Sequence, residues 1–202
     1  GDDFSKSIHE ISWWLKQVSK NFENYENHFF EIIDRIIKLD SEEINNSQDF
    51  SINHAINHPV GRAADSLLNW WFSTEPQDNE GLQVKLANQL KQLCESEQTT
   101  GMGAIILAGY LIPLYRVDQE WTKKHLIKQF YWENSKAAAM WGSFLHSPRI
   151  YPPLLNELKA PFLSVSKNFN KLDNIYCEQY VRFLTQITLS KISDFHAKEL
   201  KD

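Results

Sequence analysis

Cysteine is scarce in this chain. Its 202 residues include two cysteines, Cys94 and Cys177, which stand far apart in the sequence. No CxxC pair is present to indicate a zinc site, and two isolated cysteines do not make the dense framework of small disulfide-rich secreted domains. We therefore expect two reduced thiols in a cytoplasmic protein.

Runs of basic residues and long apolar runs are also missing. The formal net charge is −5, and no five consecutive positions are all lysine or arginine, so the chain lacks the basic face of a nucleic-acid-binding protein. The longest uncharged, largely apolar stretch, residues 99–115, contains polar residues and proline. It is shorter than the ~20 apolar residues that span a bilayer. With no signal peptide either, the sequence predicts neither nucleic acid nor membrane as a partner.

The motifs of the common enzyme classes are absent. The chain has no GxGxxG, no GxSxG, no P-loop and no HExxH, and neither cysteine has a histidine at a useful spacing. The GMG at positions 101–103 follows no strand pattern and is more typical of the start of a helix. We therefore expect this segment not to be an enzyme, and we predict no metal and no cofactor.

Helical periodicity, by contrast, runs through nearly the whole chain. Apolar residues recur every three or four positions, as they do from Ile8 to Phe22, and no segment alternates as a half-buried strand would. Asn24, Asp118 and Ser135 are the expected N-caps. We predict helices over about residues 8–22, 25–39, 59–73, 81–95, 101–115, 119–131, 137–145, 154–169 and 174–192, with a loop at 40–53.

These helices form pairs with a spacing typical of helical-hairpin repeats. The pairs cover 4–39, 58–95, 101–131 and 135–170, which favours an all-α superhelical array of the HEAT or TPR kind. An irregular helical bundle is the alternative, because no sequence motif repeats. We expect one domain over residues 1–202, and the start at Gly1 without a methionine indicates a C-terminal fragment of a longer protein.

Two histidines four positions apart, His54 and His58, raise the question of a metal site. Pro59 follows directly, and the residue before a proline is kept out of the helical region. The two histidines should therefore not share a helix, and no carboxylate set completes a site. His58 or Asn57 is better interpreted as the residue that starts the next helix.

His58, Arg62 and Asp65 are spaced so that they share one face of that helix. An Arg–Asp pair can orient a histidine as a general base. The competing interpretation is an ion pair that fixes the preceding loop onto the helix.

Tandem tryptophans occur twice, at 13–14 and at 70–71. Adjacent residues on a helix point about 100° apart. We therefore expect one member of each pair in the core and the other at a boundary or a partner surface, with Trp70 as a candidate contact.

The segment from Met140 to Val165, together with residues 53–71, resembles the C-terminal helical domain of unknown function found in bacterial proteins that carry an N-terminal sirtuin-like domain. The resemblance implies a sensor or regulator of NAD hydrolysis in antiphage defence. It transfers no catalytic residue, because the implied catalysis lies in the upstream domain. His146 departs from the aromatic residue expected in the pattern W-x-x-F-L-x-S-P-R-x-Y-x-x-L-L, which is matched here by Trp141, Phe144, Leu145, Ser147, Pro148, Arg149, Tyr151, Leu154 and Leu155.

We therefore expect a binding and regulatory module for a protein partner or a neighbouring effector domain. Recognition loops sit on rigid scaffolds, and the proline-bounded segment 146–153, with Arg149 and Tyr151, is the main surface candidate beside Trp141 and His146. Two alternatives remain. One is a small-molecule or nucleotide-binding enzyme centred on His58, Arg62 and Asp65, and the other is a homo-oligomerisation module.

Overall fold

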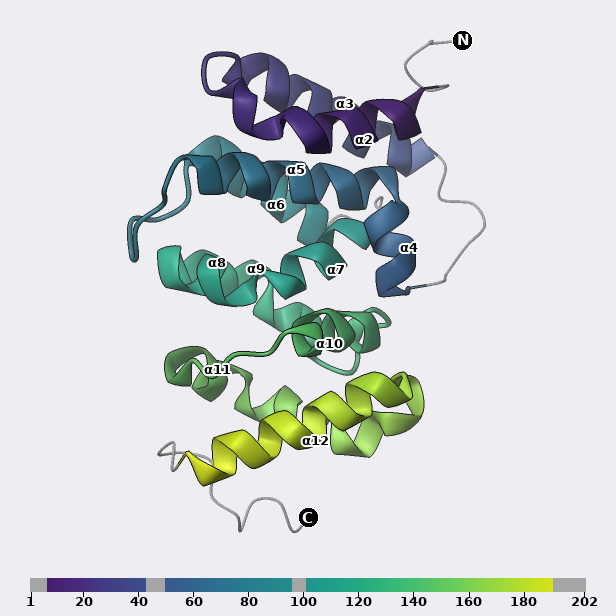
Figure 1. Cartoon of the computed structure of the whole chain (residues 1–202), viewed down its shortest axis with the longest axis vertical. Helices are drawn as coiled ribbons and strands as arrows, with labels where there is room; N and C mark the ends of the chain where they lie inside the picture. Colours follow the sequence, from purple (N-terminus) through teal and green to yellow (C-terminus); the bar gives the residue numbers. More distant parts are fainter. Residues whose placement is uncertain (1–6, 43–49, 96–100, 191–202) are drawn as a thin grey trace.

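The computed structural model describes residues 7–42, 50–95 and 101–190, and within these ranges all regular structure is helical. Figure 1 shows the helices stacked in layers along the long axis, following the order of the sequence, with α2 and α3 at one end and α12 at the other. The all-α class is confirmed, and a helical array or bundle fits this arrangement. The HEAT or TPR type of repeat stays a prediction.

Every predicted segment is helical, but four of them, 8–22, 101–115, 119–131 and 154–169, are each divided into two helices, and the short helix at 52–57 was not predicted. In three of the divided segments the second part is a short 3-10 helix. The α-helices are α2 (Ile8–Val18), α3 (Glu26–Glu42), α4 (Ile52–Asn57), α5 (Pro59–Ser73), α6 (Val84–Glu95), α7 (Met102–Gly109), α8 (Leu111–Val117), α9 (Gln119–His125), α10 (Ala137–His146), α11 (Pro152–Leu163) and α12 (Asn174–Leu189), and the 3-10 helices are η1 (Ser19–Phe22), η2 (Ile127–Phe130) and η3 (Ser166–Lys171).

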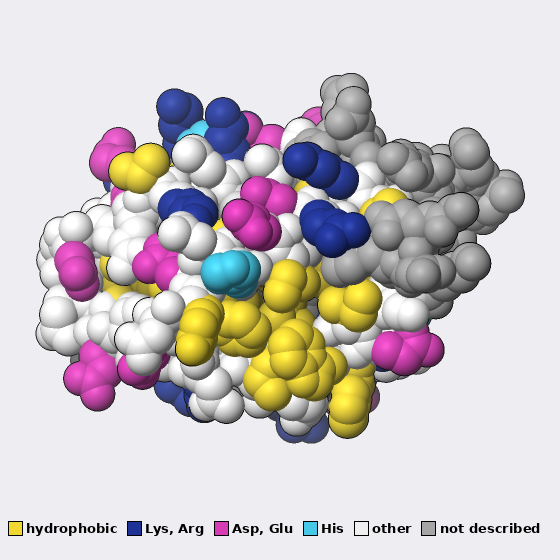
Figure 2. Space-filling model, turned by 90° about the horizontal axis from the view of Figure 1, so that it is seen from above, with side chains coloured by type: hydrophobic (Ala, Val, Ile, Leu, Met, Phe, Trp, Pro, Cys, Tyr) yellow, Lys and Arg dark blue, Asp and Glu magenta, His cyan; other side chains and the backbone are white. Residues whose placement is uncertain are grey.

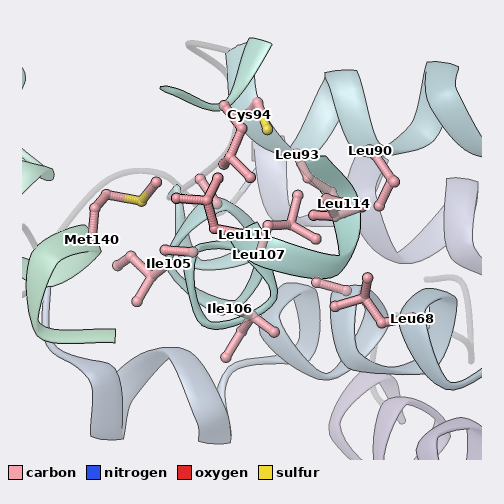
Figure 3. Packing of buried hydrophobic residues seen from close by; sticks show 14 of the residues in the cluster. Leu68, Leu90, Leu93, Cys94, Ile105, Ile106, Leu107, Leu111, Leu114 and Met140 are labelled. Atoms are coloured by element: carbon pink, nitrogen blue, oxygen red, sulfur yellow. The ribbon is translucent and has the colours of Figure 1, made fainter. Parts of the chain in front are cut away.

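Helix α7 lies at the centre of the stack. Every residue from Met102 to Ala108 is buried, and the helix packs against α4, α5, α6 and α10. Its side chains point to neighbours on several sides, for example Ile105 towards Met140 (Figure 3). A helix that is apolar all round has to be covered all round, so the sequence predicts this position correctly.

The helix predicted over residues 101–115 is broken in two at Tyr110. Pro113 has no N–H to donate to the carbonyl of Gly109, and its ring would clash with that carbonyl in a continuous helix. The chain therefore leaves the helical path after Gly109, and Pro113 occupies the first turn of α8, where a missing N–H costs nothing. The break turns the end of α7 towards the surface.

The cap predictions have mixed outcomes. The side chain of Asp118 caps α9 by accepting a hydrogen bond from the N–H of Trp121 at 2.9 Å. Asn24 and Ser135 do not occupy cap positions, because α3 starts at Glu26 and Lys136 precedes α10. Both predictions place the cap one residue early.

Both ends of the loop predicted at 40–53 are helical in the structure. Residues 43–49 lie outside the described part of the chain, α3 extends to Glu42, and α4 starts already at Ile52. Ser51 caps α4 by accepting a hydrogen bond from the N–H of His54 at 3.1 Å. Ser51 could have indicated the start of this helix in the sequence. The helix was not predicted because the segment around it is largely polar.

One continuous cluster of buried apolar side chains links the layers, from Ile8 in α2 to Ile187 in α12. Cys94 belongs to this cluster, Cys177 packs against its edge, and both are free thiols, as expected. Burial raises the pKa of the Cys94 thiol, so it is a structural rather than a reactive group.

A charged cluster joins the end of α6 to the end of α9. The carboxylate of Glu95 lies 2.8 Å from Nδ1 of His125 and accepts a hydrogen bond from Nζ of Lys128. Burial alone would raise the pKa of Glu95, but the hydrogen bonds from Lys128 and His125 outweigh it and hold the pKa below its ordinary value. A carboxylate with a lowered pKa stabilises the folded state above its unfolded-state pKa and loses that contribution as the pH falls.

We therefore expect Glu95→Gln to lower the free energy of unfolding by about 1 kcal/mol at pH 7, below the usual range for charged hydrogen bonds because Lys128 is half exposed and solvent screens its pair with Glu95. The difference from the wild type should disappear as the pH falls below 4.5, the ordinary pKa of glutamate, and through the folded-state value. Urea unfolding between pH 7 and pH 3 measures this. Glu178→Gln, in an exposed pair with Arg182, is the control, and equal pH profiles for both variants would contradict the prediction.

Candidate binding surfaces

His54 and His58 lie close to and at the junction between two helices. His54 is within α4, whereas His58 has an extended backbone and ends α4 while starting α5, with Pro59 at the first helical position. Nδ1 of His58 accepts a hydrogen bond from the N–H of Val60 at 3.3 Å, and the two histidine rings meet edge to face at 5.5 Å. The sequence-based interpretation of His58 as the helix start is confirmed.

Arg62 and Asp65 both tie α5 to α2. Arg62 donates a hydrogen bond from its Nη1 to the carbonyl of His9 at 3.2 Å, and Oδ2 of Asp65 pairs with Nζ of Lys16 at 2.7 Å. Arg62 and Asp65 also line different hollows. These contacts differ from the predicted ion pair between Arg62 and Asp65, since each side chain pairs with α2 instead of fixing the preceding loop.

Trp70 and Trp141 are core residues, which corrects their assignment as surface contacts. Trp70 is 2% exposed and Trp141 is fully buried. The ring of Trp70 packs against Phe29 and Phe30, with centroid distances of 5.8 and 5.0 Å. No partner for its indole N–H is found within the described residues.

The tandem pairs do not divide between core and surface as expected. Trp70 and Trp71 are both buried, because α5 is packed against α2 and α3 on one side and α7 on the other. Trp13 and Trp14 are both exposed, at 58% and 47%, because α2 lies in the end layer and is packed mainly against α5. The layer in which a helix lies determines whether one or two of its sides are covered. The angle of about 100° between adjacent side chains does not contain this information.

The exposed tryptophans form part of an apolar surface at the end of the stack. Trp13 and Trp14 line a shallow hollow together with Arg62, and the ring of Trp14 meets Phe22 edge to face at 6.1 Å. We call Trp13, Trp14, Phe22 and Arg62 the α2 surface. Figure 2, which looks onto this end of the molecule, shows a patch of hydrophobic side chains beside charged ones.

Three adjoining hollows form a second candidate surface, which we call the groove. The Asp65 hollow, of about 380 Å³, lies where α2, α4, α5, α7, α10 and α12 meet, and the Arg149 hollow, of about 350 Å³, shares Gly109, Tyr110 and Ser147 with it. The Pro76 hollow, of about 310 Å³, follows beyond a wall made by Pro113 and Arg116, which it shares with the Arg149 hollow. The three hollows are therefore arranged in a row.

The segment after α10 contributes to the groove, although not as one block. His146 lines the Asp65 hollow and Arg149 lines the Arg149 hollow, and both side chains are exposed. Tyr151 is half-buried and packs its ring against Tyr115 at a centroid distance of 6.2 Å. The predicted recognition segment is thus divided between two groove residues and one residue that anchors the turn.

Sequence reasoning missed the residues that connect the hollows. Tyr110 lines both the Asp65 and Arg149 hollows, and its pKa is raised by burial and by the neighbouring Asp65 carboxylate. Lys16 and Tyr176 join the Asp65 hollow from the two ends of the chain. Gly109 and Tyr110, shortly before Pro113, could have indicated a break between two helices at the surface. The residues that face this break, Lys16 and Tyr176, come from distant segments and could not be found in the same way.

Within the described part of the chain, no three histidine, cysteine, aspartate or glutamate side chains are grouped closely enough to hold a metal. Over the same residues, no helix has both the length and the apolar character needed to cross a bilayer. Comparison with protein-family models, with curated proteins and with solved structures finds no match. The resemblance to a sirtuin-associated helical domain that the motifs at 53–71 and 140–165 suggest therefore stays a prediction.

Proposed function

We propose that this chain is a protein-binding, regulatory helical module that engages its partner through the α2 surface. The observation that carries the proposal is the exposure of both Trp13 and Trp14 beside Arg62. Tryptophan and arginine are the residues most enriched among those that dominate the energy of protein interfaces. A contiguous apolar patch on a protein surface usually marks an interaction site.

The position of the surface supports the same function. In stacked helical proteins the outer face of a terminal layer is normally polar, because it faces water. Here the outer layer instead presents Trp13 and Trp14 on α2 and the partly buried Phe22 at the end of η1. An apolar terminal layer is favourable when another protein surface covers it.

The resemblance of residues 53–71 and 140–165 supplies a candidate partner. In the family that these motifs resemble, a helical part of this kind adjoins a sirtuin-like NAD-hydrolysing domain in antiphage defence. We therefore propose such a domain as the partner and regulation of its activity as the role. The α2 surface would hold it by burying aromatic side chains.

The double variant Trp13→Ala/Trp14→Ala tests the proposal. Loss of two central aromatic contacts typically costs at least ~2 kcal/mol each, so we expect the affinity for a purified sirtuin-like domain to fall about 700-fold. The melting temperature should change little, because both side chains are exposed. Isothermal titration calorimetry measures the affinity, with Ile175→Ala/Val181→Ala on exposed α12 positions as the control.

The outcomes separate the candidate functions. Unchanged binding by the double tryptophan variant would remove the α2 surface as the docking site. Absence of binding by the wild-type chain would remove the proposed partner. A dimer in light scattering that Trp13→Ala/Trp14→Ala dissociates would favour the oligomerisation alternative, with a second copy covering the same residues.

A further inference from the structure

The shape of the groove suits an extended ligand. Three hollows of about 310, 350 and 380 Å³ stand in a row and share walls. Each one has the volume of a large side chain with some water, and none is a single deep cavity of the kind that encloses a compact ligand. Successive side chains on one face of an extended peptide are about 7 Å apart, at two residues of ~3.3 Å each. A peptide of this form fills adjoining hollows in turn.

The central Arg149 hollow is basic in an otherwise acidic protein. Its walls carry Arg116 and Arg149 and no carboxylate residue, whereas the whole chain has a net charge of −5. Arg116 is held by Asp78, with its Nη2 and Nε donating to Oδ2 at 2.9 and 3.1 Å. Arg149 has no ion-pair partner among the described residues and is exposed. An acceptor in this hollow would complete the hydrogen bonding of that guanidinium group.

The two flanking hollows differ from it in charge. In the Asp65 hollow, Lys16 already neutralises Asp65. The Pro76 hollow is lined by Glu75 and by Asp78, which already pairs with Arg116, so the remaining carboxylate of Glu75 disfavours a second negative charge on the ligand there. A single carboxylate in the middle of the segment therefore matches the charge pattern of the groove.

Apolar side chains form part of the Arg149 hollow, which lies next to exposed backbone at Gly109. Ile112, Pro113 and Phe144 line it, which suits the methylene groups of an acidic side chain. Gly109 forms part of the wall shared with the Asp65 hollow and has no side chain to keep a second backbone away. Pro113 cannot donate to the carbonyl of Gly109, so that oxygen is suited to accept an N–H from a bound chain.

From this geometry we infer that the groove binds an extended protein segment that places an Asp or Glu side chain in the Arg149 hollow and an apolar side chain in the Asp65 hollow. The isoleucines Ile52, Ile56 and Ile106 line the Asp65 hollow and receive the apolar side chain. The segment crosses Gly109 between the two. This site is separate from the α2 surface and does not depend on the function proposed for it.

Selection from a phage-displayed library of random short peptides against the full chain tests the inference. We expect the enriched peptides to share an acidic residue two positions away from an apolar one, because side chains on one face of an extended chain alternate. Fluorescence anisotropy with the best such peptide should then show at least a tenfold loss of affinity for Arg149→Glu, since a charged hydrogen-bonded pair contributes ~1.5–3 kcal/mol. Replacing the peptide's acidic residue with lysine should restore binding to Arg149→Glu.

Two controls make the result decisive. Arg182→Glu makes the same charge change on an exposed arginine of α12, outside the groove, and should bind the peptide as the wild type does. Trp13→Ala/Trp14→Ala should also leave this binding intact, which distinguishes failure here from failure of the α2 surface. Enrichment of peptides without acidic residues, no enrichment at all, or equal binding by Arg149→Glu and Arg182→Glu would each overturn the inference.

Discussion

Replacing Trp141 with alanine is expected to lower the free energy of unfolding by about 3–5 kcal/mol, the range for removing a large aromatic side chain from a well-packed core. Trp141 is fully buried and contacts the rings of Phe130, Phe144 and Phe162 at centroid distances of 4.9, 5.9 and 5.8 Å. Its Nε1 also donates a hydrogen bond to the carbonyl of Phe130 at 2.9 Å. The variant therefore loses packing and leaves a buried acceptor without its donor. Urea unfolding followed by circular dichroism measures the change.

Trp13→Ala is the matched control, because it makes the same chemical change at a position that is 58% exposed. Its effect on stability should stay within about 0.5 kcal/mol, as is usual for exposed sites. A loss below about 1 kcal/mol for Trp141→Ala, or equal losses for the two variants, would contradict the burial described here. The same pair also separates the roles of tryptophan in this chain, since only Trp13 should affect binding to a partner.

Local chemistry accounts for the parts of the fold that the sequence predicts well. The histidine before Pro59 had to leave the helical region, and it caps α5 as expected. The apolar stretch 102–108 had to be covered on all sides, and α7 lies at the centre. These features depend on neighbours in the chain or on the composition of a single helix, so no knowledge of the tertiary arrangement is needed.

The tryptophan pairs show where this reasoning stops. Pairs 13–14 and 70–71 have the same local geometry, yet one is exposed and the other is buried. The difference arises because α2 is in an end layer and α5 is between two layers. Layer position depends on contacts between segments far apart in the sequence, which helical periodicity does not contain.

The candidate sites follow the same division. Arg149 was predicted as a surface residue because prolines bound its loop, and it lines the groove. The groove itself was not predicted, because the Asp65 hollow requires α2, α5, α10 and α12 to converge on the break between α7 and α8. A single sequence therefore indicates which residues are available for binding, and the stacking of the helices determines which of them meet.

Gly61→Ala is expected to lower the free energy of unfolding by about 3 kcal/mol, at the upper end of the usual cost of overpacking. A Cβ at this position of α5 would lie 1.8 Å from the carbonyl oxygen of Ala55 in α4. That neighbour is backbone, so no side chain can rotate away, and α4 has to move by more than an ångström. Because α4 also packs against α7 and α10, the movement disturbs the central layers. The gain in helix propensity from glycine to alanine, about 1 kcal/mol, is too small to compensate.

Gly109→Ala is the control for backbone effects, because it makes the same substitution near the end of another helix. There the new Cβ meets Oγ of Ser143 at 3.3 Å, and a serine side chain can rotate, so stability should change by less than about 0.5 kcal/mol. Amide hydrogen exchange gives a second readout that is specific to the junction. In Gly61→Ala the amides of α4 should exchange faster while those of α12, at the far end of the stack, keep their rates. If Gly61→Ala has wild-type stability and unchanged exchange in α4, then α4 and α5 do not cross at Gly61. In that case Ile52 and Ile56, which lie in α4, would not line the Asp65 hollow as described.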